Sequence, residues 1–311
     1  MPQIVIPDDE PAVVSVSAAY AKLEGMDVRA YTSRPSNEAE LIERIRGARF
    51  VINVRARTAF TREVFRACPE LKLISIWGTG TDNVDLAAAR ELGIRVTNTP
   101  GVSAIAVAEH ALTLMLAVAR KIVQVDSQVR QGQWPRAMVS RIHGKTLGLI
   151  GTGAIGGEMA RLGKAVGCRV IAWTFHPRGG IAEWVSFEDV FRQSDFVSLH
   201  VRQSPETVGM IRREHFEMMK PGAILINTAR GAIVNEADLL EALEAGRIAG
   251  AGLDVFEKEP LPEKSPFLSL PNVVLTPHSA GITPETTEAG IAMAIDNILR
   301  FIAGAPVNVV V

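Results

Sequence analysis

Residues 146–156 have the sequence TLGLIGTGAIG, and a helical pattern of apolar residues continues over 155–166. The first five residues, Thr146–Ile150, predict a short buried strand because they are largely apolar. Gly151, Gly153 and Gly156 then give the Gly-x-Gly-x-x-Gly spacing. Between a strand and a helix, this spacing is typical of a loop that binds the pyrophosphate of a dinucleotide.

Each glycine of this loop has a physical reason in that interpretation. Gly151 permits a sharp turn, Gly153 leaves the backbone open to the pyrophosphate, and Gly156 allows close packing of helix and strand. The free N–H groups at the start of the helix, which is the positive end of the helix dipole, attract the phosphates. A glycine turn of purely structural use is the alternative. The predicted phosphate-binding set is Gly151, Gly153, Ala154, Ile155 and Gly156.

The segments on both sides of this loop alternate between short apolar runs and helical patterns. Such alternation predicts parallel sheets covered by helices on both faces. Strands are predicted at 3–6, Phe50–Val54, Leu73–Trp77 and Arg95–Thr97, then at Thr146–Ile150, Arg169–Trp173, 196–200, 223–227, 249–253 and Val273–Leu275. Helices are predicted at 37–46, 103–130, 155–166, 236–245 and 284–303. Two such series predict an α/β protein with two doubly wound domains.

Composition places the chain among ordinary globular proteins. It has 311 residues, 47% of them hydrophobic, and a formal net charge of −1. That charge offers no attraction to nucleic acid or to an anionic membrane. The longest apolar stretch, 104–119, contains Glu109 and His110 and is too short to span a bilayer. With Cys68 and Cys168 far apart and no Cys-x-x-Cys pair, we expect reduced thiols, no metal site and a cytoplasmic location.

The end of the second strand of the later series bears on cofactor choice. NAD-binding folds place an acidic residue there to accept the hydroxyls of the adenine ribose. This chain has Thr174, followed closely by His176 and Arg178. Without the carboxylate, a 2′-phosphate is not repelled, and these three residues are suited to binding it. We therefore expect NAD or NADP, with NADP favoured; the alternative is an exposed loop without ligand contact.

Three charged residues follow three successive strands near the end of the later series. Arg230, Glu259 and His278 should converge because ligands in open α/β sheets bind beyond the carboxyl ends of the strands. We predict that His278 transfers a proton, that Glu259 orients its imidazole, and that Arg230 holds a carboxylate and polarises a carbonyl. Singly, each has an ordinary alternative: a loop cap, a solvated surface charge and a structural ion pair, respectively.

Motifs along the whole chain resemble those of the D-isomer-specific 2-hydroxyacid dehydrogenase family. In order they are 78–85 (GTGTDNVD), 107–112 (VAEHAL), 132–134 (GQW), 144–148 (GKTLG), the glycine loop, 227–231 (NTARG), 254–260 (DVFEKEP) and 276–278 (TPH). The resemblance implies that Arg230, Glu259 and His278 are the catalytic residues. The carboxylate at position 259 differs from the Gln that formate dehydrogenases have there.

The resemblance also implies a domain organisation and further site residues. A flavodoxin-like substrate domain would comprise 1–99 and 283–311, and a Rossmann domain 100–282, with a homodimer built on the latter. Thr79 and Gly80 match the loop that holds the substrate carboxylate, and Arg55 matches an arginine near the substrate. Further implied cofactor contacts are Val201, Thr228, Ala229, Asp254 and Ala280.

The resemblance implies reduction of a small 2-keto acid to its D-2-hydroxy acid, for which glyoxylate and hydroxypyruvate are the expected substrates. Two departures from the family pattern are Thr174, in place of Asp, and Arg202, in place of a proline. Two other hypotheses stay open. One is a nicotinamide-sensing corepressor of the same fold, and the other is an oxidoreductase acting on an oxyanion such as phosphite.

Overall fold

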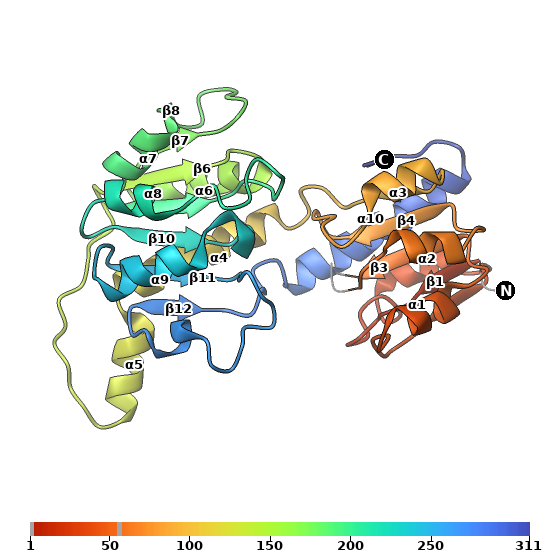
Figure 1. Ribbon diagram of the computed structural model, residues 1–311, viewed down its shortest axis with the longest axis horizontal. Coiled ribbons are helices and arrows are strands. Elements are labelled where there is room, and N and C mark those ends of the chain that lie inside the picture. Colours follow the sequence, from red (N-terminus) through yellow and green to blue (C-terminus); the bar gives the residue numbers. More distant parts are fainter. Residues whose placement is uncertain (1–2, 55–57) are drawn as a thin grey trace. The chain divides into compact units, whose positions relative to one another are not determined.

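The computed structural model describes residues 3–54 and 58–311, which form two compact units. The first unit comprises Met1–Ser103 and Ile282–Val311, and the second comprises Ala104–Gly281. These divisions fall within a few residues of the predicted boundaries at 99/100 and 282/283. The chain is therefore an α/β protein with two parallel sheets (Figure 1).

The first unit is built on a five-stranded parallel sheet of order β2-β1-β3-β4-β5, the flavodoxin-like order. Its strands are β1 (Ile4–Ile6), β2 (Val28–Ala30), β3 (Phe50–Val54), β4 (Leu73–Trp77) and β5 (Arg95–Thr97). Its helices are η1 (Ala18–Leu23), α1 (Glu38–Ile45), α2 (Arg62–Ala67), α3 (Leu86–Glu91) and α10 (Pro284–Ile302). Strand β2 is missing from the sequence prediction because it has three residues at the sheet edge, none of them buried.

Helix α10 brings the end of the chain back onto the sheet of the first unit. The Ser75 hydroxyl donates a hydrogen bond to the carbonyl of Ala294 at 2.8 Å, and Gly290 packs against the indole of Trp77. A Cβ at position 290 would lie 2.0 Å from Trp77 Nε1, so only glycine permits this approach. Because residue 290 meets 77 and 294 meets 75, α10 runs antiparallel to β4.

The second unit holds a seven-stranded parallel sheet of order β12-β11-β10-β9-β6-β7-β8, the Rossmann order with an added strand. Its strands are β6 (Thr146–Ile150), β7 (Arg169–Trp173), β8 (Glu183–Trp184), β9 (Phe196–Leu199), β10 (Ile224–Asn227), β11 (Gly250–Leu253) and β12 (Val273–Leu275). The sequence did not predict β8, because a two-residue edge strand carries no periodic signal.

Helices cover both faces of this sheet (Figure 1). They are α4 (Ala104–Ala119), α5 (Ile122–Arg130), α6 (Ala154–Ala165), α7 (Phe187–Gln193), α8 (Arg213–Met218), α9 (Glu236–Glu244) and the short turns η3 (Gly231–Ile233) and η4 (Pro266–Ser269). The single helix predicted over 103–130 is wrong: Lys121 has a φ of +51° and separates α4 from α5. Helix α5 has no buried residue, whereas α4 lies in the core.

Candidate active site

The glycine loop joins β6 to α6 at the point where the strand order of the second unit reverses. A Cβ on Gly151, which has a φ of +95°, would lie 2.7 Å from the carbonyl carbon of His200. A Cβ on Gly156 would lie 2.1 Å from the carbonyl oxygen of Gly151. Both glycines are therefore required by close approaches within the protein.

Gly153 differs from its two neighbours, because a Cβ there would meet no atom within 4 Å. Its φ of −67° and ψ of −159° also lie in the extended region that other residues adopt. The protein's own packing thus gives no reason for glycine at this position. Gly153 is also the N-cap of α6 and supplies no side-chain hydrogen bond, which leaves the N–H groups of the first turn available to an anion.

The residues predicted to choose the cofactor follow β7. Thr174 is partly exposed, while His176 and Arg178 are exposed. Beside them, Phe175 packs edge-to-face on Trp173 with 4.8 Å between ring centroids, which anchors the start of this loop. Within residues 3–54 and 58–311, the side chains of Thr174, His176 and Arg178 make no hydrogen bond or ion pair.

The loop after β10 carries Arg230 and is shaped by the residues around it. The Asn227 side chain donates to the carbonyl of Arg230 at 2.9 Å and accepts from the N–H of Ala229 at 3.0 Å. Gly231 lies directly against the loop after β11, since a Cβ there would be 1.9 Å from the carbonyl carbon of Phe256. These contacts hold the arginine loop beside the loop that carries Glu259.

Glu259 and His278 form a hydrogen-bonded pair. Glu259 Oε2 lies 2.7 Å from His278 Nδ1, and Glu259 Oε1 accepts the N–H of Phe256 at 3.0 Å. Burial alone would raise the pKa of Glu259, but the hydrogen bonds from His278 and Phe256 and the charges of His278 and Arg230 lower it below its usual value. The carboxylate is thus held ionised beside the imidazole and near the guanidinium.

The backbone of His278 has a φ of +53°, which a non-glycine residue adopts only when its surroundings enforce it. Asp254 supplies that enforcement. Its carbonyl accepts the N–H of His278 at 2.7 Å, and its buried carboxylate accepts the N–H groups of Ser279 and Ala280, both at 2.9 Å. The Thr276 hydroxyl donates to the same carboxylate at 2.6 Å.

The first unit carries the predicted substrate loop at the end of β4. Gly78 has a φ of +147° and donates its N–H to the Thr99 hydroxyl at 2.9 Å. The Asn98 side chain donates to the carbonyl of Thr79 at 2.8 Å. The N–H groups of Thr79 and Gly80 donate to no acceptor in the described part of the chain. Arg55 lies outside the described residues.

Other features of the described chain concern its cysteines, its metal-ligating side chains and its helices. Cys68 and Cys168 are free and buried, and burial raises the pKa of both thiols. Residues 3–54 and 58–311 contain no cluster of three or more His, Cys, Asp or Glu arranged to hold a metal ion. In the same ranges, no helix combines the length and apolarity needed to cross a bilayer.

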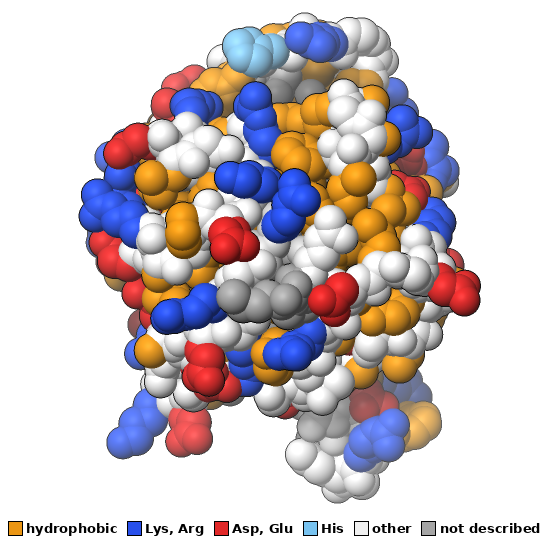
Figure 2. All heavy atoms as spheres, turned by 90° about the vertical axis from the view of Figure 1, so that its right-hand side faces the viewer, with side chains coloured by type: hydrophobic (Ala, Val, Ile, Leu, Met, Phe, Trp, Pro, Cys, Tyr) orange, Lys and Arg blue, Asp and Glu red, His pale blue; other side chains and the backbone are white. Residues whose placement is uncertain are grey.

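Acidic, basic and hydrophobic side chains are interspersed on the face in Figure 2, so no single sign of charge dominates it.

Comparison with known proteins decides the family. Residues 112–280 match the model of the D-isomer specific 2-hydroxyacid dehydrogenase, NAD binding domain. A glyoxylate reductase of Korarchaeum cryptofilum is 40% identical over 289 residues, which cover 89% of this chain and 86% of that protein. The chain belongs to the D-isomer specific 2-hydroxyacid dehydrogenase family. It is an NAD(P)-dependent oxidoreductase of that class.

Two further relatives bear on the substrate and the cofactor of this dehydrogenase. A hydroxypyruvate reductase of Thermotoga maritima is 43% identical over 241 residues, covering 76% of this chain and 79% of that protein. The solved structure of an acyclic imino acid reductase, Bsp5, in complex with NADPH and D-Arg superposes with a TM-score of 0.92. It is 34% identical and covers 99% of both chains.

The residues of this dehydrogenase fit a bound dinucleotide. Gly153 leaves open space where the backbone meets the uncapped start of α6, and this is the place where the family holds the pyrophosphate. Val201 lies in the loop after β9 and Ala280 in the loop after β12, while Thr228 and Ala229 directly follow β10; all three loops leave the carboxyl edge of the sheet. Their predicted cofactor contacts stay predictions.

Some supporting residues of the dehydrogenase were missed by sequence reasoning. Asn227 and Gly231 lie within a quoted motif, but nothing in the sequence shows that they position Arg230 against the next loop. Asp254 is one of the predicted cofactor contacts, and the structure adds that this residue is 1% exposed and that its carboxylate braces the His278 loop. His110 supports the same loop, with Nε2 2.9 Å from the Thr276 hydroxyl.

Proposed function

We propose that this enzyme interconverts a small 2-keto acid and its D-2-hydroxy acid, with His278 as the general acid and base. The observation that supports this most directly is the 2.7 Å pair of His278 Nδ1 and Glu259 Oε2. The pair uses one imidazole nitrogen and leaves Nε2 for a substrate oxygen. Arg230 lies close enough to help stabilise the ionised Glu259, so the three residues belong to one site.

The chemistry divides between cofactor and protein. The reduced nicotinamide, when bound, supplies the hydride that no side chain can provide. His278 Nε2 donates the proton that the carbonyl oxygen gains, and in the reverse direction it accepts that proton. Glu259 fixes the orientation of the imidazole and stabilises its charged form. In each direction, one proton moves between His278 Nε2 and the substrate oxygen.

Substrate binding requires a cation and N–H donors for the carboxylate of the keto acid. We assign Arg230 to the carboxylate and carbonyl oxygens, because a guanidinium binds such oxygens through two parallel hydrogen bonds. The N–H groups of Thr79 and Gly80 are assigned to the same carboxylate, and the family resemblance places Arg55 among the residues near the substrate. We propose that glyoxylate and hydroxypyruvate are among the substrates, since relatives at about 40% identity carry these names.

We further propose NADP as the favoured cofactor. Thr174 stands where NAD enzymes place an acidic residue, and the exposed His176 and Arg178 follow it. The related imino acid reductase was solved with NADPH, which agrees with this assignment.

A homodimer is the proposed assembly. Helix α5 has no buried residue, and Ile122 and Val123 are 56% and 55% exposed. The segment after it exposes Trp134 by 80% and Met138 by 90%. Apolar side chains gathered in one exposed segment mark an interaction surface, and the family resemblance favours a second copy of this chain as the partner. Sedimentation of the protein and of the Trp134→Ser, Met138→Ser double variant tests this, since a monomeric wild type would contradict it.

The deciding experiment follows the loss of reduced-nicotinamide absorbance with glyoxylate, hydroxypyruvate and pyruvate, each with NADH and NADPH. Turnover of any of them supports the reaction, and the ratio of kcat/KM for NADPH to that for NADH measures the cofactor preference. If the cofactor binds and no keto acid is reduced, the proposal fails. The sensing role or an oxyanion substrate such as phosphite then becomes the better hypothesis.

A further inference from the structure

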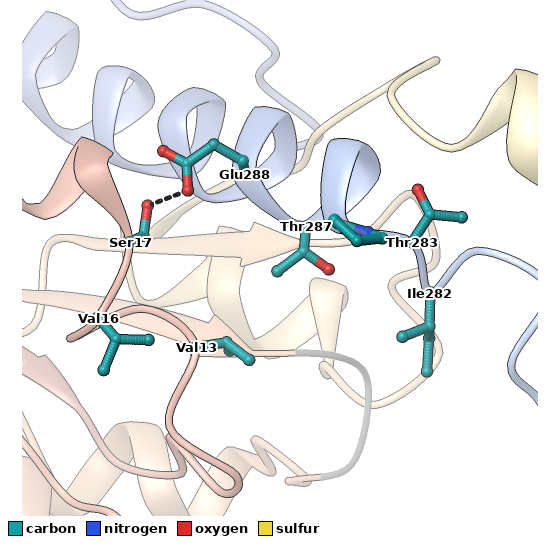
Figure 3. A pocket seen from close by; sticks show the side chains of 8 residues that line it. Val13, Val16, Ser17, Ile282, Thr283, Thr287 and Glu288 are labelled. Atoms are coloured by element: carbon teal, nitrogen blue, oxygen red, sulfur yellow. Dashed lines mark hydrogen bonds between the residues drawn. The ribbon is translucent and has the colours of Figure 1, made fainter.

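The first unit contains an apolar pocket that the predicted site does not include. It has a volume of about 380 Å³ and is open to solvent. Its lining residues are Val13, Val16, Ser17, Ile282, Thr283, Pro284, Thr287 and Glu288. Figure 3 shows Val13 and Val16 across from the start of α10, with Ser17 and Glu288 at one end and Thr283 and Ile282 at the other.

The direction of α10 places this pocket at the same edge of the sheet as the predicted substrate loop. Gly290 packs on Trp77, the last residue of β4, and α10 runs antiparallel to that strand. A helix rises about 1.5 Å per residue, so residues 283–288 extend past the carboxyl end of β4. Thr79 and Gly80 come directly after that end. The wall of the pocket formed by α10 is thus on the carboxyl side, where the N–H groups of this loop are found.

The opposite wall is a loop that the protein holds in a fixed conformation. It follows the carboxyl end of β1, and the buried carboxylate of Asp9 accepts the N–H groups of Val13, Val14 and Ser15 at 2.8–3.0 Å. These hydrogen bonds lower the pKa of Asp9 against the effect of burial, so the carboxylate stays ionised and bonded. The pocket wall is therefore formed before any ligand arrives.

The lining selects for a particular ligand chemistry. Val13, Val16, Ile282 and Pro284 present carbon atoms, and burial of an aliphatic group against them is favourable. Glu288 closes one end, where its carboxylate accepts hydrogen bonds from the Ser17 hydroxyl at 2.8 Å and the Ala19 N–H at 3.0 Å. Its negative charge disfavours a second carboxylate or a phosphate on the ligand.

We propose that this pocket receives the side chain of the 2-keto acid, and that the preferred substrates carry an uncharged aliphatic side chain. The inference rests on the proposed function, in which Thr79 and Gly80 hold the substrate carboxylate. Glyoxylate has no side chain to place there, so it would leave the pocket unfilled.

The first test is a series of keto acids of rising chain length. The series is glyoxylate, pyruvate, 2-oxobutanoate, 2-oxopentanoate and 4-methyl-2-oxopentanoate, measured with the preferred cofactor. Each additional buried carbon should raise kcat/KM by about threefold to fourfold, which corresponds to the free energy gained when one methylene group leaves water. 2-Oxoglutarate, of similar length with a second carboxylate, should fall well below 2-oxopentanoate.

Two variants test whether the preference for longer keto acids depends on this pocket. Val16 is 73% exposed, so Val16→Glu adds a charge to the lining without disturbing the core. It should lower kcat/KM for 4-methyl-2-oxopentanoate by about tenfold or more and leave glyoxylate unaffected, because only the longer substrate would bury the charge. Leu92→Glu is the matched control: Leu92 is 41% exposed and does not line the pocket, so both substrates should keep wild-type values.

A binding measurement separates this inference from the proposed function. Calorimetric titration of the cofactor-loaded enzyme with the unreactive 4-methylpentanoate and with acetate gives their affinities without turnover. Tighter binding of 4-methylpentanoate that Val16→Glu abolishes supports the pocket, even if no keto acid is reduced and the proposed function fails. A flat kcat/KM series with glyoxylate reduced normally, or equal affinities of both acids, overturns the inference and leaves the proposed function intact.

Discussion

Replacing Glu259 by Gln is the sharpest test of the proposed acid–base pair, because the geometry predicts how the amide will sit. The N–H of Phe256 points at Oε1 from 3.0 Å, so the amide oxygen must face Phe256 and the amide NH2 must face His278. The NH2 group then donates to Nδ1, which lies 2.7 Å from the present Oε2. His278 is thereby held with its proton on Nε2.

The consequence differs between the two directions of the reaction. Oxidation requires Nε2 to accept a proton, and the variant holds this nitrogen protonated. Reduction requires an imidazolium, which has lost the carboxylate that stabilised it. General acid–base catalysis by a positioned side chain contributes about two to four orders of magnitude, and the variant leaves His278 with a held proton in one direction and without its counter-charge in the other. We therefore expect a loss of about tenfold to a thousandfold in turnover near neutral pH.

The assay is a pair of pH–rate profiles, one for each direction, from pH 5 to pH 9. In both directions the rate of the variant should stay below that of the wild type at every pH in this range, because no pH restores the hydrogen bond between His278 Nδ1 and a carboxylate. Cofactor affinity, measured by quenching of protein fluorescence, should be unchanged and serves as the control. Superimposable profiles for variant and wild type would refute the assigned role of the pair.

Three further predictions address the cofactor loop, the brace of the catalytic loop and a partly buried histidine. Gly153→Val should weaken cofactor binding by about tenfold or more with the melting temperature unchanged, whereas Gly156→Val should lower the melting temperature because its Cβ would overlap a carbonyl; equal melting temperatures would contradict this. Asp254→Asn should lower kcat by about tenfold to a hundredfold, because the new amide NH2 would face one of the backbone N–H groups that the carboxylate accepts. Cofactor affinity should be unchanged. A loss of cofactor affinity with kcat unchanged would instead support the predicted contact between Asp254 and the cofactor. Burial lowers the pKa of His200 to about 4, against 6.5 ordinarily, so the folded state binds fewer protons than the unfolded state between these values. The free energy of unfolding should therefore decrease as the pH falls from 6.5 towards 4, by up to about 3 kcal/mol, and melts of His200→Gln should show a smaller decrease than the wild type.

Much of the fold follows from local patterns in the sequence. Central strands such as Thr146–Ile150 and Phe50–Val54 are buried on both faces, so they appear as apolar runs that a single sequence reveals. The short strands Val28–Ala30 and Glu183–Trp184 do not, because they pair along one edge only and half of their environment is solvent. The break at Lys121 likewise lies within an uninterrupted helical pattern, and only the backbone shows it.

The sequence by itself determined the alternation of strands and helices and the glycine loop, and it predicted Arg230, Glu259 and His278 as site residues. These depend on residue type and on spacing along the chain, which are local properties. Only the tertiary structure decided that Gly231 brings two loops together and that Asp254 braces the strained backbone of His278. It alone formed the pocket between the loop after β1 and the start of α10. These contacts join segments distant in sequence, whose approach is set by packing that no local pattern records.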